Sequence, residues 1–543
     1  MKKIFTLIIL LTGLSALRAQ LSDTMSVNDI SARIGADGVM FINTDYTSEY
    51  RVPKSQAAST FYSSGNWIGG IDDGGLLHVA AQTYRQSGGD FWAGPIADDY
   101  TGADYMDRYL RNWKMTKAQV DDHIAHWADA GYVVPAAIAE WPGTGNAANG
   151  EATVLAPYYD NNNNHIYEPA LGDYPLIRGD ECIFSIYNDL KLTHFESGGL
   201  PLGLEVHCMA YAFNMPDDSA LSKTIYFNYQ LINRSANNYH SVIMGTFDDF
   251  DVGVWSDDYS GCDTTQNMYY AYNGDCEDDG GSPNYGSYPP AQGVVWLNRH
   301  MLMFKIYTND FSLTGNPTLP DQFYGYLEGN WKDGTPQTYG GTGYGGVSPC
   351  RYMFPNGPYD GGWNMDIAGY TGIDIRALSS CEPFSLDAGD TTCIDIALVT
   401  AFSFSDPPPG SYPDSCQAKD AVEVLKSRIP AVRDFYAGLP ECLTAYQQNP
   451  DNNTAIASAS NTTTVSLYPM PATGRVWLHV PASWQSSELH YRLMNVQGAV
   501  IMDGTLPASF TPSLDLQSIP NGYYTIEISG PDGERVVVKC VKE

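Results

Sequence analysis

The last stretch of the chain, residues 465–543, alternates short apolar runs with turns. It reads V-S-L-Y-P-M-P-A-T-G-R-V-W-L-H-V at 465–480, Y-R-L-M-N-V-Q-G-A-V at 491–500, L-D-L-Q-S-I-P-N-G-Y-Y-T-I-E-I at 514–528 and R-V-V-V-K-C-V-K-E at 535–543. Apolar and polar residues alternate within each run, and Gly, Pro and Asn separate the runs, which is typical of half-buried strands joined by turns. About seven such runs in about eighty residues predict a small, immunoglobulin-like β-sandwich.

The rest of the chain is also expected to be mainly β. Its 543 residues are too many for one ordinary core, and 52 Gly with 33 Pro indicate many turns. The runs 204–215, 223–232 and 241–247 predict a central antiparallel sheet, which the run 391–404 closes. We therefore expect a large antiparallel β-sandwich-like core.

Two helical segments are expected within this core. The first spans about 116–128, and its apolar positions Val120, Ile124 and Trp127 form one stripe at helical spacing. The second spans about 414–439 and contains a proline that would interrupt or kink it.

The balance of charges excludes some classes of partner. Lys and Arg number 29 against 62 Asp and Glu, for a formal net charge of −33. Nucleic acids and anionic membrane surfaces require clustered cations and are poor partners for such a chain. A soluble surface protein explains this charge. Carboxylates that hold divalent cations are a second explanation, compatible with the first.

The N-terminus is expected to direct export. Residues 1–19 carry two lysines followed by an apolar run that is too short and wrongly flanked for a spanning helix, which indicates a secretory signal peptide. No other stretch is long and apolar enough to predict a membrane span. The expected organisation is a signal peptide at 1–19, a β-rich extracellular core at 20–445, a linker of small polar residues at 446–464 and the β-sandwich at 465–543.

Ten cysteines in an exported chain predict disulfides. The candidate pairs are the neighbours in sequence: Cys262 with Cys276, Cys381 with Cys393, and Cys416 with Cys442. Spacing alone does not fix the connectivity.

The terminal stretch resembles the C-terminal sorting domain (type A) of bacterial type IX secretion. The matching motifs, in the expected order, are Tyr468-Pro469-Met470-Pro471-Ala472, Asn495-Val496-Gln497-Gly498, Ile519-Pro520-Asn521-Gly522-Tyr523-Tyr524 and the basic tail with Lys539 and Lys542. Met470 stands where Asn is usual, and Cys540 in the tail is a second departure. The resemblance implies export across both membranes to the cell surface or beyond, with the type IX secretion machinery as a partner.

The core resembles large exported surface proteins that carry the same sorting domain and have no established activity. The matching segments include W-I-G-G-I-D at 67–72, L-H-V-A-A-Q-T-Y-R at 77–85 and G-D-Y-P-L-I-R-G-D at 172–180. This resemblance supports export to the cell surface and does not indicate an activity or a ligand.

The segment from residue 160 to residue 173 predicts a calcium loop. Oxygen groups at alternate positions of a tight loop can converge on one hard cation. The expected ligands are Asp160, Asn162, Asn164, the carbonyl of Ile166 and Glu168, with Asp173, or alternatively Asp180, to complete the shell. His165 stands where Gly is preferred, although His tolerates the left-handed backbone that such a turn requires. A solvated, Asn-rich turn is the alternative.

A second acidic cluster follows the strand-like run at 241–247. So many carboxylates close together repel one another unless they are solvated or neutralised by a cation. The candidate calcium ligands here are Asp249, Asp251, Asp257, Asp258 and Asp263. Solvated charge in a strand-end loop is the alternative.

Motifs for catalysis are lacking in the sequence. Neither G-x-S-x-G nor a phosphate-binding Gly-rich loop occurs, and chance pairs of carboxylates are inevitable among 62 acids. Aromatic residues at 255–296 could form a sugar-stacking platform or build a core, and we favour the core. These are Trp255, Tyr259, Tyr269, Tyr270, Tyr272, Tyr285, Tyr288 and Trp296.

Three functions follow from the sequence, in this order. The first is a secreted or surface-attached structural or adhesive protein, stabilised by calcium and disulfides, with other surface proteins as partners. The second is a carbohydrate-binding surface module with glycans as partners. The third is a hydrolase without a recognisable motif, and we expect no enzyme on balance.

Overall fold

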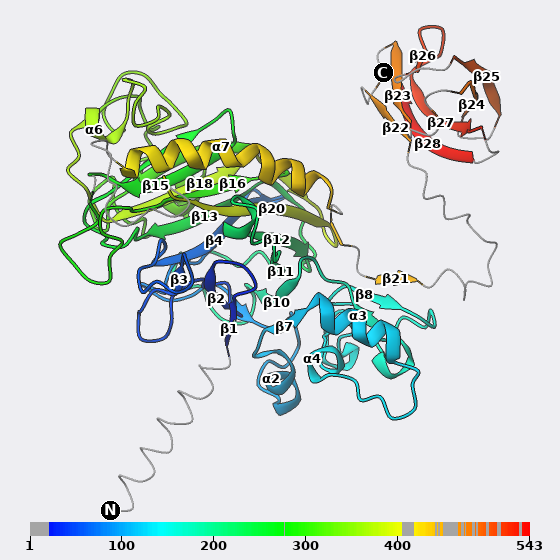
Figure 1. The fold of residues 1–543 in the computed structure, drawn as a ribbon, viewed down its shortest axis with the longest axis horizontal. Coiled ribbons are helices and arrows are strands. Elements are labelled where there is room, and N and C mark those ends of the chain that lie inside the picture. The colour runs from blue at the N-terminus through cyan, green and yellow to red at the C-terminus, as the bar shows by residue number, and fades with distance from the viewer. Residues whose placement is uncertain are drawn as a thin grey trace, which may run out of the picture. The chain divides into compact units, whose positions relative to one another are not determined.

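The structure is a computed structural model. It describes residues 21–542 apart from 276, 404–416, 440–441, 444–445, 449–464, 469–471, 473, 481–483, 485–486, 496–498, 508–511 and 532–534. The predicted signal peptide lies outside the described residues. The chain divides into two compact units, Met1–Asn452 and Asn453–Glu543. The fold is mainly β, as predicted (Figure 1).

A nine-stranded antiparallel sheet forms the centre of the first unit. Its strand order is β14-β15-β16-β20-β12-β11-β10-β6, and β7 also pairs with β10. The bounds are β6 Trp92–Ala93, β7 Trp113–Thr116, β10 Glu181–Asn188, β11 Leu204–Ala212, β12 Thr224–Asn233, β14 Asp258–Asp263, β15 Met268–Asn273, β16 Ala291–Trp296 and β20 Thr391–Ala401.

A six-stranded antiparallel sheet packs against one face of it. The strand order is β17-β18-β13-β4-β5, and β19 pairs with β13. The bounds are β4 Ser63–Asp72, β5 Leu77–Ala81, β13 Tyr239–Phe250, β17 Met301–Tyr307, β18 Ile375–Cys381 and β19 Phe384–Leu386. The two sheets are joined by buried contacts: the indole Nε1 of Trp296 donates to Ser379 Oγ at 3.0 Å, and the hydroxyls of Thr246 and Tyr269 are 2.6 Å apart.

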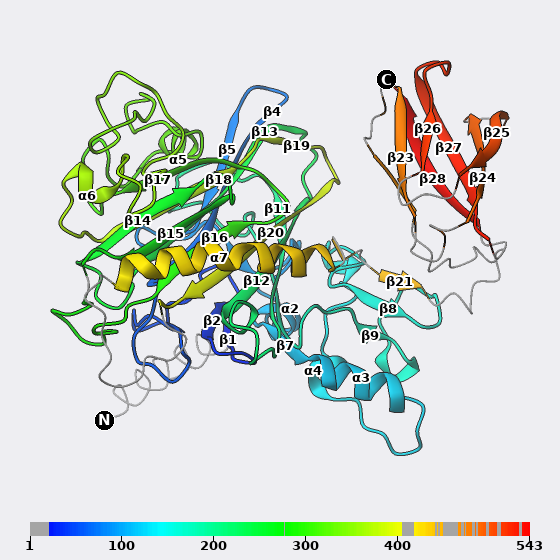
Figure 2. The same cartoon turned by 45° about the horizontal axis from the view of Figure 1, so that its top comes forward.

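Two helices cover the outer faces of this sandwich. Helix α7 (Gln417–Ala437) lies across the nine-stranded sheet, where the side chain of Leu425 packs against Gly293 of β16 (Figure 2). Helix α5 (Pro320–Leu327) covers the six-stranded sheet, and a Cβ at Gly69 of β4 would stand 2.6 Å from the ring of Tyr324. The first unit is therefore a β-sandwich with one helix on each side.

Smaller elements surround the sandwich. Two three-stranded sheets have the orders β1-β2-β3 and β21-β8-β9. Their bounds are β1 Ser22–Met25, β2 Ser31–Gly35, β3 Tyr50–Arg51, β8 Tyr158–Asp160, β9 Tyr174–Pro175 and β21 Tyr446–Gln448. The remaining helices are α2 Ala103–Tyr109, α3 Lys117–His126, α4 Ala136–Ala139 and α6 Met365–Ala368, with 3-10 turns η1 Ala147–Asn149, η2 Pro169–Leu171 and η3 Leu221–Lys223.

The second unit is a sandwich of two sheets, as predicted. Three strands have the order β22-β23-β26 and four the order β25-β24-β27-β28. The bounds are β22 Ser466–Tyr468, β23 Arg475–His479, β24 Leu489–Asn495, β25 Val500–Leu506, β26 Ser513–Asp515, β27 Gly522–Ser529 and β28 Arg535–Lys542. Buried side chains from both sheets, such as Leu478 and Ile526, share one apolar core.

Three expectations about the first unit are corrected. Strand β13 lies in the six-stranded sheet and not beside β12, because it pairs with β4 and β18. Helix α7 is not interrupted at Pro430, and among the described residues four more short helices accompany it and α3. The predicted linker begins with a strand, because β21 pairs in parallel with β8. None of the described helices is long and apolar enough to cross a membrane.

The disulfide among the described residues differs from the predicted pairs. Cys393 is bonded to Cys442, whereas Cys262 and Cys381 are buried free thiols. Cys381 ends β18 and Cys393 belongs to β20, so the two lie in different sheets. Helix α7 runs along the sheet that contains β20. Cys442, which follows this helix, therefore lies near the start of β20, where Cys393 is. The other predicted partners, Cys276 and Cys416, lie outside the described residues.

Candidate metal centre

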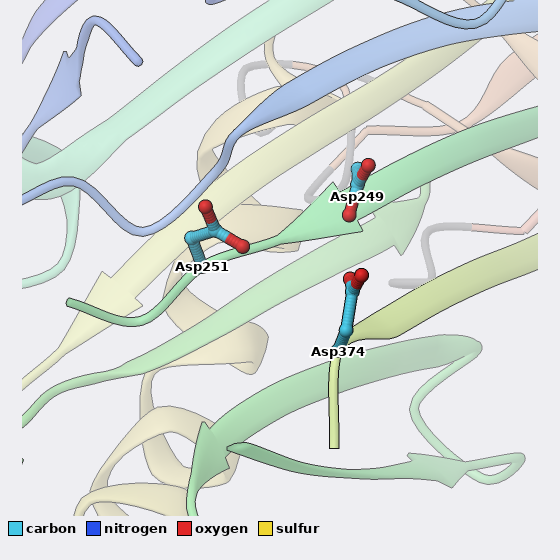
Figure 3. Close-up of side chains that lie close together, drawn as sticks. All are labelled: Asp249, Asp251 and Asp374. Atoms are coloured by element: carbon cyan, nitrogen blue, oxygen red, sulfur yellow. The ribbon is translucent and has the colours of Figure 1, made fainter. Parts of the chain in front are cut away.

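Three aspartates meet at the end of the paired strands β13 and β18. Asp249 belongs to β13, Asp251 lies just beyond its end, and Asp374 directly precedes β18. One carboxylate oxygen from each lies within 4.8 Å of the others, and Figure 3 shows the three side chains around a common space. Antiparallel pairing of β13 with β18 produces this arrangement, because it places Asp249 opposite Arg376.

The electrostatics of this triad favour an additional positive charge. Burial, followed by the neighbouring Asp374, raises the pKa of Asp251 to about 8, while Arg376 opposes the shift. Burial also raises the pKa of Asp249 well above its usual value, against the attraction of Arg376. The guanidinium Nη2 of Arg376 stands 3.8 Å from Asp249 Oδ2. One arginine thus faces three carboxylates, so that ionisation of all three leaves an excess of two negative charges.

The spacing of the triad fits a calcium ion. Calcium binds oxygen at roughly 2.3–2.6 Å, so two oxygens on one ion lie no more than about 5 Å apart. The separations in the triad meet this limit. Calcium takes about six to eight oxygen ligands, so backbone carbonyls or water would complete its shell. The residues present therefore fit the ion.

The other predicted ligands of this cluster are placed differently. The Asp258 carboxylate is fully buried and accepts the backbone N–H of Val252 at 3.0 Å, so it holds the chain directly after Asp251 and is not one of the three clustered carboxylates. Asp257 lies in the segment before β14 and has a buried oxygen without a hydrogen-bond partner among the described residues. Asp263 ends β14, where its carboxylate accepts the backbone N–H groups of Thr265 and Gln266 and so holds a turn.

The loop predicted at 160–173 curls around its own oxygen groups. The Asp160 carboxylate is buried and accepts the backbone N–H groups of Asn164 and His165 at 3.2 and 2.8 Å. The Asp173 carboxylate is also buried, and it accepts the N–H groups of Asn161 and Glu168 at 2.8 and 2.7 Å. The two buried acids thus fix the ends of the loop.

The polar side chains between them point to one another. Asn164 Nδ2 donates to Glu168 Oε2 at 2.5 Å, and Asn162 Nδ2 approaches the same oxygen at 3.4 Å. The backbone N–H of Ile166 donates to Asn164 Oδ1 at 2.8 Å. His165 has a φ of 63°, the left-handed conformation expected for it. Burial raises the pKa of Asp173, and Asp160 and Glu168 add to the shift, so negative charge is concentrated here as well.

The aromatic residues of 255–296 mostly belong to the core. Tyr269, Tyr270 and Trp296 are fully buried, and Tyr272 and Tyr259 nearly so. Trp255 differs, because 54% of its surface is exposed. The core interpretation therefore holds for most of this set, and a stacking platform made from all eight is excluded by their burial.

The sorting motifs occupy strands of the second unit. Tyr468 ends β22, Asn495 ends β24 and its side chain accepts the backbone N–H of Ala499, Gly522 begins β27, and Lys539 lies in β28 opposite Thr525. Six motif residues lie outside the described residues: Pro469, Met470, Pro471, Val496, Gln497 and Gly498.

Two solved structures are remotely similar to the chain. A polysaccharide lyase matches at 8% identity and a TM-score of 0.19, covering 62% of this chain and 34% of its own. The BSP domain of a biofilm-associated protein matches at 8% identity and a TM-score of 0.14, covering 67% of this chain and 60% of its own. The chain therefore spans less than two thirds of either protein. No curated protein matches it.

The second unit is where a family model matches. The model of the secretion system C-terminal sorting domain covers residues 466–543, which are the seven strands described above. The protein is thus exported to the cell surface or the extracellular space, and residues 466–543 are its type IX secretion sorting domain.

Proposed function

We propose that this protein is a structural or adhesive component of the cell surface whose first unit is stabilised by calcium. The observation that supports it is the triad of Asp249, Asp251 and Asp374, buried or half-buried and neutralised only in part by Arg376. Extracellular modules bind calcium with dissociation constants of about 10⁻⁴ to 10⁻³ M, which suits an exported protein.

The loop at 160–173 is proposed as a second calcium site. Its ligands would be Asp160, Asn162, Asn164, the carbonyl of Ile166, Glu168 and Asp173. Such a loop would place the ion beside the last described strand of the first unit, because Asp160 ends β8 and pairs with Gln448 of β21.

Thermal unfolding of the purified protein in excess calcium and in chelator tests the proposal. Calcium should raise the melting temperature, and Asp251→Asn should reduce the rise. Asp263→Asn is the matched control, because that aspartate holds a turn away from the triad. Equal melting temperatures of the unaltered protein in both conditions would refute the calcium proposal.

The structural or adhesive role requires a test on cells. Cells that lack the protein should attach to surfaces or to one another less than cells that have it, and calcium depletion should reproduce part of the loss. Unchanged attachment after removal of the protein would contradict this role. It would not test the calcium sites.

A further inference from the structure

A cavity of about 230 Å³ opens on the outer face of the six-stranded sheet, beside helix α5. Its floor consists of the buried rings of Trp67, Tyr307 and Phe323. The rings of Trp67 and Phe323 meet edge to face at 4.7 Å. Because these three come from β4, β17 and α5, the floor belongs to the sandwich itself and not to a loop.

One wall of the cavity is polar and centred on Glu196. The Glu196 carboxylate accepts the hydroxyl of Thr83 at 2.9 Å and the backbone N–H groups of Ser87 and Gly88 at 3.0 Å each. A carboxylate has about four acceptor positions, so one is left for a ligand. The hydroxyl of Ser87, which also lines the cavity, has no hydrogen-bond partner among the described residues.

Arg376 holds two further polar side chains of the lining in place. Its Nη1 donates to Gln86 Oε1 at 2.6 Å and to Asn316 Oδ1 at 2.7 Å, and both acceptors line the cavity. The amide groups of Gln86 and Asn316 then meet at Asn309 Oδ1. Side chains fixed in this way need little further ordering when a ligand binds.

An exposed aromatic ring stands at the mouth. Phe311 lines the cavity, yet 80% of its surface is exposed. It is carried by a closed turn, because Asp310 Oδ1 accepts the N–H of Ser312 and the Asp310 carbonyl accepts the N–H of Asn316. A large apolar ring held in water at the rim of a polar cavity supplies a face against which the C–H side of a ligand can stack.

The lining also restricts the charge of a ligand. Lys and Arg are lacking among the residues that line the cavity, and Glu196 is the one carboxylate among them. An anionic ligand would meet a carboxylate without a compensating cation. The volume is below the roughly 300 Å³ at which pockets for drug-sized ligands begin, so the ligand is small.

We propose that this cavity binds one neutral sugar unit, with Phe311 stacked on the ring and Glu196 and Ser87 bonded to its hydroxyls. The unit could be a free monosaccharide or the end of a glycan chain, which offer the same hydroxyl groups. The site shares no lining residue with the calcium triad, so it goes beyond the proposed structural or adhesive role.

Binding to the full chain can be measured by titration calorimetry and by saturation-transfer NMR. The probes are glucose, galactose, mannose, N-acetylglucosamine, glucosamine and glucuronic acid, with a glycan array as the arm for chain ends. We expect one neutral sugar to bind with a dissociation constant on the order of millimolar. Array binding without any monosaccharide binding would assign the site to chain ends and still support it.

Two matched variants locate the site. Phe311→Ala should weaken binding roughly 5- to 10-fold, because it removes the stacking ring without disturbing the core. Trp255→Ala removes an exposed ring elsewhere and should leave binding unchanged. Ser87→Ala should also weaken binding, because it removes a hydroxyl that contacts the sugar.

The proposal is overturned by any of four results. These are a lack of sugar binding in both arms, preference for glucosamine or glucuronic acid over every neutral sugar, unchanged affinity in Phe311→Ala, and loss of binding in Trp255→Ala. Because none of these measurements depends on calcium, failure here is distinguishable from failure of the calcium proposal.

Discussion

Arg376 lies directly opposite Asp249 on the neighbouring strand, with its guanidinium 3.8 Å from the carboxylate. The same guanidinium donates to Tyr84, Gln86 and Asn316 on its other side. One buried cation thus stands between the acidic triad and the polar wall of the cavity. Its removal would affect both.

The loss of Arg376 should therefore depend on calcium. Arg376→Met leaves buried carboxylates without their cation and should lower the free energy of unfolding by about 3–5 kcal/mol in chelator. Excess calcium should restore part of this loss, because the ion replaces the missing charge. Urea unfolding in both conditions measures the difference. Arg351→Met, at an exposed site, is the control, and equal losses with and without calcium would contradict the prediction.

The stabilisation by calcium should increase with pH. The pKa of Asp251 is raised from 3.8 to about 8 in the folded protein, chiefly by burial. Its contribution to stability in chelator is fully present below pH 3.8 and is lost as the pH rises to about 8. Bound calcium favours the ionised form and offsets this loss. The difference between the melting temperatures with and without calcium should therefore increase from pH 5 to pH 8. A decrease of this difference over the same range would contradict the proposed site.

The loop at 160–173 should loosen when Asp173 loses an acceptor. Asp173→Asn keeps one side-chain oxygen as acceptor for two backbone N–H groups. It should lower the free energy of unfolding by about 1–3 kcal/mol. Faster amide hydrogen exchange confined to this loop would show the effect. Asp180→Asn, just outside the loop, is the comparison, and unchanged exchange in Asp173→Asn would argue against its anchoring role.

The disulfide should contribute substantially to the stability of the first unit. It joins Cys393 to Cys442, which are 49 positions apart in the sequence. Loop-closure entropy predicts a loss of about 4 kcal/mol when it is removed. Cys442→Ser and reduction of the unaltered protein should lower the midpoint of urea unfolding equally. Retention of the original midpoint in the variant would show that the bond contributes little.

Export should require the second unit. A chain that lacks 465–543 should accumulate in the periplasm, because its sorting domain is gone. Fractionation of cells and detection of the chain in each compartment check this. A periplasmic passenger fused to 453–543 should in turn reach the surface, and surface display of the truncated chain would refute the assignment.

The sequence predicts local structure in this protein better than it predicts which side chains contact one another in the fold. Helix α3 begins after Thr116, whose side chain accepts the N–H of Gln119 in a capping box. The expected stripe is only partly correct: Val120 is buried, whereas Ile124 is 43% exposed and His123 takes the buried position. His123 Nε2 lies 3.0 Å from the carbonyl of Asp173, so a polar contact decides which face turns inward.

The candidate metal centre was predictable only in part, because it too depends on contacts between distant segments of the chain. Asp249 and Asp251 belong to an evident acidic run, but Asp374 stands alone in the sequence and far along the chain. Its role depends on the pairing of β13 with β18, which strand patterns do not reveal. Sequence periodicity shows which residues form strands and not which strands become neighbours.

The short pair of β21 with β8 determines how the first unit would bear a mechanical load. Tension applied through the second unit reaches the first at residues 446–448, which are hydrogen-bonded to β8. If that pair yields, the load passes to Cys442 and through its covalent bond into β20, in the middle of the nine-stranded sheet. Helix α7 lies outside this load path. A pull on the C-terminal end of the first unit would therefore act on a central strand of the nine-stranded sheet before it acted on the helix.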